Sequence, residues 1–159
     1  MNISNVLTKD FLIKVANFEG YRSKPYKCAA GYWTIGFGTR MYDYDGKTKV
    51  SVSIDESYLL LKNHLRKIYF ELDKLLKLDH FSVSQVQALL DFCYNCGVSR
   101  LKNSSMWFYL LRYNRRFPHT KKVFDTIICN VLKKYCHAGN KVLPGLQIRR
   151  NFETRLWLY

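Results

Sequence analysis

A long amphipathic stretch in the middle of the chain constrains the fold most. Ser53-Ile-Asp-Glu56 has the Ser-x-x-Glu pattern of a capping box, which starts a helix. Apolar residues then recur at alternating spacings of four and three over about five or six turns; they are Leu61, Leu65, Ile68, Leu72 and Leu75. This pattern predicts a helix over about residues 54–77 with one buried face. The rest of the chain must supply the partners of that face.

The segments before this helix have two different periods. Leu7, Phe11 and Val15 recur at four-residue spacing, which predicts a helix that ends near Gly20. From residue 31 to residue 52, glycines alternate with β-forming residues, and Asp45-Gly46 is typical of a tight hairpin turn. We therefore expect a small antiparallel sheet after the first helix.

The segments after the long helix are predicted to be helical. Ser82-Val-Ser-Gln85 is a second capping signal, and the helix that it starts should stop near Gly97. Further helices are expected over residues 106–112 and 121–135, and a last one carries Ile148, Phe152 and Leu156. The predicted fold class is α+β and mostly α-helical, with residues 1–159 as one domain. It has a small β-containing lobe over about 19–53, a connecting helix over about 54–77, and a helical lobe over about 78–159 that includes the N-terminal helix.

The segment from residue 19 to residue 38 carries the chemistry. Glu19 lies at the end of the first predicted helix, where the negative end of the helix dipole disfavours an ionised carboxylate. A carboxyl group that keeps its proton is suited to general acid catalysis. Position alone also fits a solvated glutamate at a helix end.

Several motifs in order resemble the phage-type lysozymes, or endolysins. Glu19-Gly-Tyr-Arg22, followed by Tyr26, Gly31, Trp33 and Thr34-Ile-Gly-Phe-Gly38, resembles the active-site signature of that family. In the family, a catalytic Glu is followed after nine residues by an Asp and after six more by a Thr. The resemblance continues through residues 84–97, through the segment from Asn103 to Asn114, and through residues 139–153. It implies a lysozyme-like two-lobed fold and hydrolysis of the β-1,4 bond between N-acetylmuramic acid and N-acetylglucosamine in peptidoglycan.

The catalytic residues that the resemblance implies are Glu19, Cys28 and Thr34, with a cysteine at the position of the family's aspartate. Glycoside hydrolysis usually needs two carboxyl groups. By resemblance, Glu19 is the proton donor and Thr34 helps to hold the attacking water. Cys28 then has three possible roles: it acts as base or nucleophile, it switches the site off when oxidised, or it marks the loss of the base, which leaves a protein that binds glycan without cutting it efficiently.

Further residues are candidates for substrate binding; they are Tyr26, Tyr32, Gln85, Asn95, Arg149 and Arg150. The two tyrosines offer flat apolar faces to sugar rings. Gln85 and Asn95 can donate hydrogen bonds to substrate, although helix capping suits Gln85 better. In the family, an arginine near Arg149 and Arg150 pairs with the catalytic Glu; the alternative is an exposed helix with two solvated arginines.

The chain is strongly basic, with 26 basic and 12 acidic residues and a net charge of +14. Such a surface attracts polyanions, among them nucleic acids, anionic membranes and cell walls, and charge alone does not choose among them. With the resemblance, the expected partners are the glycan strands of peptidoglycan, bound by a monomer without nucleic acid or stable membrane insertion. The alternatives are a lysozyme-fold protein that binds the wall without efficient cleavage and a basic protein that binds membranes or nucleic acids.

The five cysteines indicate folding in a reducing compartment, since their number is odd and no secretory signal is recognised. Cys93-x-x-Cys96, with Cys129 and Cys136-His137, superficially suggests zinc. Cys93 and Cys96 lie within an apolar helical stripe, however, so buried thiols are favoured, and we expect neither metal nor cofactor. We expect synthesis in the bacterial cytoplasm without a signal peptide, and action on the wall after release through a separate pore or secretion system.

Overall fold

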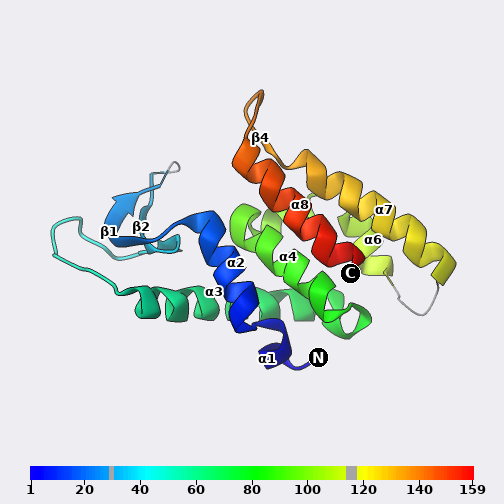
Figure 1. Ribbon diagram of the computed structural model, residues 1–159, viewed down its shortest axis with the longest axis horizontal. Helices are drawn as coiled ribbons and strands as arrows, with labels where there is room; N and C mark the ends of the chain where they lie inside the picture. The colour runs from blue at the N-terminus through cyan, green and yellow to red at the C-terminus, as the bar shows by residue number, and fades with distance from the viewer. Residues whose placement is uncertain (29–30, 114–117) are drawn as a thin grey trace. The chain divides into compact units, whose positions relative to one another are not determined.

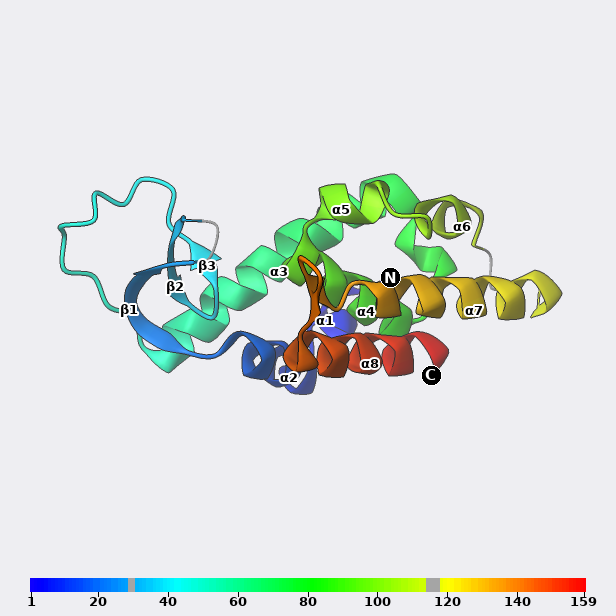
Figure 2. The same ribbon diagram turned by 90° about the horizontal axis from the view of Figure 1, so that it is seen from above.

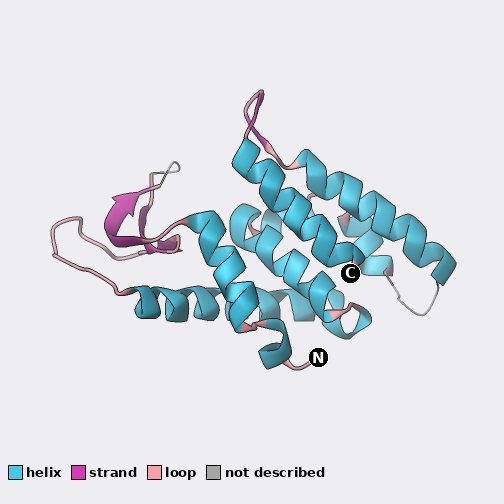
Figure 3. Ribbon diagram, in the orientation of Figure 1, coloured by secondary structure: helices cyan, strands magenta, loops and turns pink. Residues whose placement is uncertain are grey.

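The computed structural model describes residues 1–28, 31–113 and 118–159, without the side chains of residues 118 and 119. Helices dominate and the strands are few, which confirms the predicted α+β, mostly helical class (Figure 3). The chain forms two compact units, Leu7–Lys67 and Met1–Val6 with Ile68–Tyr159. The division falls within one long helix, so each unit is described by itself.

Helix α2 (Lys9–Glu19) opens the unit Leu7–Lys67. The side chain of Thr8 caps its first turn by accepting the N–H of Phe11 at 3.3 Å. At its end, Gly20 has a φ of 71° and donates its N–H to the Ala16 carbonyl at 3.1 Å. The predicted helix that ends near Gly20 is therefore confirmed.

Three short antiparallel strands follow in the order β1-β2-β3 (Figure 2): β1 (Arg22–Lys27), β2 (Trp33–Gly36) and β3 (Thr39–Arg40). Tyr26 lies opposite Thr34 and Lys27 lies opposite Trp33, with a bulge in β1 between Arg22 and Tyr26. The small antiparallel sheet is confirmed, but it begins before residue 31, because the Arg22–Lys27 segment forms its first strand.

Residues 41–53 form a loop, so the hairpin predicted at Asp45-Gly46 is wrong. The Asp45 carboxylate accepts the N–H groups of Lys47 and Thr48 at 2.8 Å each, and it also accepts the Thr48 hydroxyl at 2.8 Å. A side chain that satisfies the local backbone donors closes a turn without a strand ladder.

Helix α3 (Ile54–Leu76) contributes to both units. Its capping box is formed as predicted: Glu56 donates its N–H to the Ser53 hydroxyl at 3.2 Å, and Ser53 donates its N–H to the Glu56 carboxylate at 2.7 Å. The predicted stripe is buried with one exception, since Leu75 is half-buried and Leu76 takes its place in the core.

The unit of Met1–Val6 and Ile68–Tyr159 is almost entirely helical. Its elements are α1 (Ile3–Val6), a 3-10 turn (Leu78–His80), α4 (Val83–Cys96), α5 (Val98–Lys102), α6 (Trp107–Arg112), α7 (Pro118–Lys134), the hairpin of β4 (His137–Ala138) and β5 (Lys141–Val142), and α8 (Pro144–Leu158). Helix α8 packs against α4 and α7 (Figure 1). No helix in the described part of the chain combines the length and the apolarity that crossing a bilayer needs.

Helix α8 buries a polar face, which the sequence did not predict. The predicted last helix, which carries Ile148, Phe152 and Leu156, is confirmed, but these residues do not form its buried face: Ile148 is 62% exposed and the other two are half-buried. The buried residues are Arg149, Arg150, Glu153, Thr154 and Trp157. Their spacing of three and four residues defines one side of the helix. The core of this unit therefore contains charges that must be paired.

Candidate active site

Glu19 is the last residue of α2 and is half-buried. Gly20 follows with a φ of 71°, a left-handed conformation that glycine adopts without strain, and so the chain turns from the helix into β1. Glu19 is thus held at the junction between a capped helix and the sheet.

Tyr26 connects Glu19 to Cys28 electrostatically. Burial raises the pKa of the Tyr26 phenol, the Arg22 guanidinium opposes this rise, and the nearby Glu19 and Cys28 add to it. The Arg22 guanidinium lies 4.4 Å from the centre of the Tyr26 ring. Glu19 and Cys28 both belong to the unit Leu7–Lys67, as Tyr26 does.

Cys28 lies directly after β1 and is half-buried. Its N–H donates to the Tyr32 carbonyl at 2.9 Å, and its carbonyl accepts the N–H of Gly31 at 2.8 Å. These two bonds fix the Cys28 backbone at the turn between β1 and β2. Residues 29 and 30 of the signature lie outside the described residues.

Thr34 is buried on β2, directly opposite Tyr26. Residues directly opposite each other in an antiparallel pair have side chains on the same face, so Thr34 shares the face of Tyr26. The Thr34 hydroxyl donates to the Tyr32 carbonyl at 3.0 Å. Its oxygen keeps acceptor lone pairs and can still bind the hydrogen of a water.

Tyr32 is 48% exposed, but its ring has a partner. The Arg40 guanidinium lies 3.4 Å from the ring centre of Tyr32 and 4.8 Å from that of Tyr42. Because a guanidinium at this distance covers one face of the ring, at most the other face remains for a sugar.

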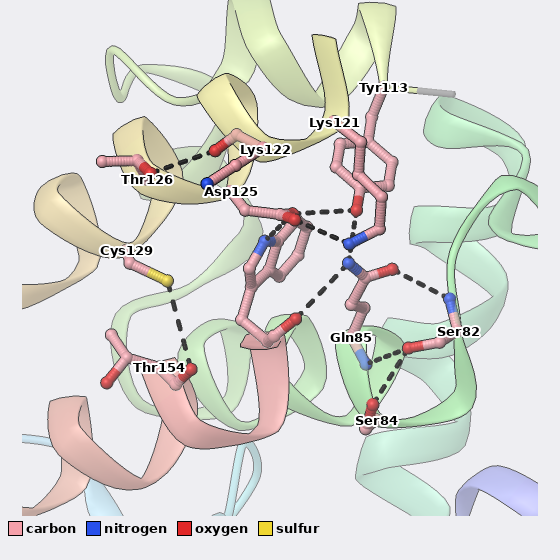
Figure 4. Close-up of polar contacts among 11 residues, drawn as sticks. Ser82, Ser84, Gln85, Tyr113, Lys121, Lys122, Asp125, Thr126, Cys129 and Thr154 are labelled. Carbon is pink, nitrogen blue, oxygen red and sulfur yellow. Dashed lines mark hydrogen bonds and ion pairs between the residues drawn. The ribbon is translucent and has the colours of Figure 1, made fainter. Parts of the chain in front are cut away.

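Gln85 belongs to the other unit and is a structural residue. It forms the capping box of α4 with Ser82, as predicted, and only 3% of it is exposed. Its amide donates to the Tyr113 hydroxyl, which donates to Asp125 at 2.8 Å (Figure 4). Burial in this network leaves no room for a sugar, which corrects the prediction that Gln85 contacts substrate.

Arg149 and Arg150 are both buried, so the alternative of two solvated arginines is wrong. Arg149 donates to both carboxylate oxygens of Asp91, at 3.0 and 2.9 Å. Arg150 lies 2.6 Å from the Glu153 carboxylate and donates to the exposed Asn95 side chain at 2.9 Å. The guanidinium of the buried Arg149 is therefore bound by Asp91. The Asn95 side chain is exposed and is held in place by the hydrogen bond from Arg150.

A family model described as phage lysozyme matches residues 16–153, a stretch that includes Glu19, Cys28 and Thr34. The chain belongs to the phage lysozyme family. It is 34% identical over 146 residues to the endolysin of Bacillus phage B103, covering 91% of this chain and 51% of that protein. It is 28% identical over 149 residues to the SAR-endolysin of Haemophilus phage HP1, covering 91% of this chain and 76% of that protein. The chain therefore spans about half the length of the first relative and about three quarters of the second.

Solved structures share the fold. The muramidase domain of SpmX from Asticaccaulis excentricus has a TM-score of 0.74 at 23% identity, covering 96% of this chain and 97% of that one. The endolysin of Escherichia coli O157:H7 phage FAHEc1 has a TM-score of 0.70 at 23% identity, covering 96% and 92%. At such identities the likeness shows the fold alone, and it confirms the lysozyme-like architecture.

The cysteines of this family member form no disulfide in the described residues, which include all five. Burial raises the pKa of the Cys129 thiol to about 11 and raises that of Cys93 well above the ordinary thiol range. Within residues 1–28, 31–113 and 118–159, no three His, Cys, Asp or Glu side chains gather as metal ligands.

Sequence reasoning missed the acidic partners of the two arginines. Asp91 lies within the predicted apolar stripe of α4, and Glu153 follows the paired arginines on α8. Both carboxylates are fully buried. The available signal was an acidic residue on an apolar helix face, since such a residue is almost never buried without a partner. Asn114, quoted for the resemblance, lies outside the described residues.

Proposed function

We propose that this chain hydrolyses the β-1,4 bond between N-acetylmuramic acid and N-acetylglucosamine in peptidoglycan, with Glu19 as the general acid. The observation that carries the proposal is the position of Glu19 at the end of α2, in the same compact unit as Cys28 and the buried Thr34. Membership of the phage lysozyme family supports the same reaction.

In the proposed reaction, Glu19 gives its proton to the glycosidic oxygen as the bond to the sugar carbon breaks. Thr34 accepts a hydrogen bond from the attacking water. Cys28 occupies the place of the second carboxylate and acts in one of two ways. As a base, its thiolate takes a proton from water, which inverts the anomeric carbon. As a nucleophile, its sulfur bonds to that carbon and water later displaces it, which retains the configuration.

The test is the loss of turbidity of purified peptidoglycan under reducing conditions, with the natural chain and the variants Glu19→Gln, Cys28→Ala and Cys28→Asp. We expect clearing by the natural chain and by Cys28→Asp, and none by Glu19→Gln or Cys28→Ala. If the natural chain clears the wall no faster than Glu19→Gln, the proposed reaction is wrong. If only Cys28→Asp clears it, the base has been lost, and the natural chain binds wall glycan without cutting it.

We also propose that the chain is a monomer made in a reducing cytoplasm and released to the wall through a separate pore or secretion system. Cysteines that form no disulfide in the described residues suit reducing conditions. The molar mass in solution, measured by light scattering, tests whether the chain is a monomer. Lysis of producing cells only when a pore-forming protein is co-expressed tests the route.

A further inference from the structure

The unit Leu7–Lys67 has a concave site that the proposed reaction does not use. A pocket of about 490 Å³ lies between β1, β2 and the 41–53 loop, and its lining includes Lys24, Trp33, Tyr44, Lys47 and Lys49. This volume falls within the range of roughly 300–1,000 Å³ that is usual for ligand pockets.

The pocket lies on the sheet face opposite to Thr34. Tyr26 pairs with Thr34, whereas Lys27 pairs with Trp33, one residue further along each strand. Successive side chains of a strand point to opposite faces. Because Trp33 lines the pocket, the pocket and Thr34 lie on different faces of the sheet.

The lining of the pocket is positively charged. No acidic residue lines it, and no ion pair in the described part of the chain involves Lys24, Lys47 or Lys49. The nearby Asp45 turns its carboxylate into its own loop, where hydrogen bonds from Thr48 and from the N–H of Lys47 lower its pKa. The pocket therefore favours an anionic group.

An aromatic wall stands beside these lysines. The rings of Trp33 and Tyr44 meet edge to face at 5.2 Å, and a fourth cation, the Lys27 ammonium, lies 5.4 Å from the Trp33 ring. A Cβ added at Gly46 would lie 3.2 Å from the indole, so the loop backbone approaches this ring closely. Trp33 and Tyr44 are both half-buried, and the aromatic surface that they leave open suits the C–H face of a sugar ring.

The loop that carries Lys47 and Lys49 is held in place by hydrogen bonds. Met41 donates its N–H to the Trp33 carbonyl at 2.8 Å, and Val52 donates its N–H to the Ser23 carbonyl at 2.9 Å. Within the loop, the Tyr44 hydroxyl donates to the Thr48 carbonyl at 2.7 Å. Because the loop is anchored at both ends, it loses less conformational entropy when a ligand binds in the pocket.

We propose that this pocket is a wall-binding site, separate from the catalytic face, that takes an anionic group next to a sugar ring. That the ligand belongs to the cell wall rests on the proposed function. The anion comes either from phosphodiester polymers attached to the wall or from carboxylates of peptidoglycan itself. Binding there holds the chain on its substrate between cleavage events.

The test measures co-sedimentation of the non-cleaving Glu19→Gln chain with purified cell walls. We expect Lys47→Gln/Lys49→Gln to weaken binding about tenfold. The control, Lys9→Gln/Lys62→Gln, removes the same charge from exposed helix positions and should weaken binding less than about twofold. Tyr44→Ala should also weaken binding, whereas Tyr44→Phe, which keeps the ring, should not. Equal losses in the two lysine pairs would mean that net charge alone attracts the wall, and would overturn the site.

Hydrofluoric acid treatment of the walls, which removes phosphodiester polymers, separates the two sources of the anion. If binding is lost after treatment, the anion is the phosphate of these polymers. If binding persists and still depends on Lys47 and Lys49, the anion is a carboxylate of peptidoglycan. A short DNA duplex that competes equally through these lysines would overturn the preference for a sugar. A natural chain that fails to clear walls, but binds them through this pocket, would contradict only the proposed hydrolysis.

Discussion

Arg149 and Asp91 form a two-point ion pair in which both side chains are buried, across 58 residues of sequence. Nε and Nη2 of Arg149 donate to the two carboxylate oxygens of Asp91, and Nη2 also donates to the Asp91 carbonyl at 3.3 Å. The pair joins α8 to α4. Such a pair is hard to break, because loss of one partner leaves a buried charge without compensation.

We predict that Arg149→Met lowers the free energy of unfolding by about 3–5 kcal/mol, since Asp91 then stays buried without its cation. The double variant Arg149→Met/Asp91→Leu should recover much of that loss. Denaturant unfolding of both singles and the double gives the coupling energy. Arg155→Met removes an exposed arginine from the same helix and should change stability by less than about 0.5 kcal/mol. A similar effect of the two single arginine variants would contradict the importance of the pair.

Gln85 should affect stability and leave substrate binding unchanged. We predict that Gln85→Ala costs about 2–4 kcal/mol, because it removes the side-chain half of the capping box and leaves the buried Tyr113 hydroxyl without its donor. Thermal unfolding measures the loss, and the rate of wall clearing at several substrate concentrations, below the melting temperature, gives KM. The exposed Gln147→Ala is the matched control for stability. A raised KM in folded Gln85→Ala would show that Gln85 contacts substrate after all.

Glu153 should make stability depend on pH. Burial raises the pKa of its carboxyl well above the ordinary range, and the neighbouring Asp91 adds to the rise against the two arginines. A raised pKa in the folded state means that stability is fully present below the unfolded value of about 4.3 and is lost as the pH rises toward the folded value.

The corresponding variant is Glu153→Gln, which cannot ionise. We predict that its free energy of unfolding falls less than that of the natural chain between about pH 4.5 and pH 7. Unfolding in urea at several pH values measures this slope, and Glu71→Gln, at an exposed position, should keep the natural slope. Parallel profiles for the natural chain and Glu153→Gln would show that Glu153 is ionised in the folded state.

The sequence predicted those parts of the fold that depend on local interactions. The capping boxes at Ser53 and Ser82 and the helix end at Gly20 formed as expected, because their partners lie within four residues. The polar face of α8 was missed because Arg149 depends on Asp91, far away in the chain. The hairpin predicted at Asp45 is absent because the Asp45 carboxylate accepts the N–H groups of Lys47 and Thr48.

The candidate site was likewise predicted from the sequence only in part. Motif spacing brought Glu19, Cys28 and Thr34 together as catalytic candidates, and they lie in one compact unit. The pairing of Tyr26 with Thr34 depends on a bulge in β1, which no sequence pattern marked. The pocket beside Trp33 depends on the path of the 41–53 loop, and that path is set by hydrogen bonds to Trp33 and Ser23.

Exposure should decide which of the five thiols reacts first. Cys28 and Cys96 are half-buried, whereas Cys93, Cys129 and Cys136 are buried, and burial raises the pKa of Cys129 to about 11. Since the thiolate is the reactive form, iodoacetamide near neutral pH should modify Cys28 and Cys96 first, as read by mass spectrometry. Loss of wall clearing should follow the modification of Cys28. Cys96→Ser should be inactivated at the natural rate, and Cys28→Asp should resist. Inactivation of Cys28→Asp at the natural rate would place the sensitive thiol elsewhere and remove Cys28 from the reaction.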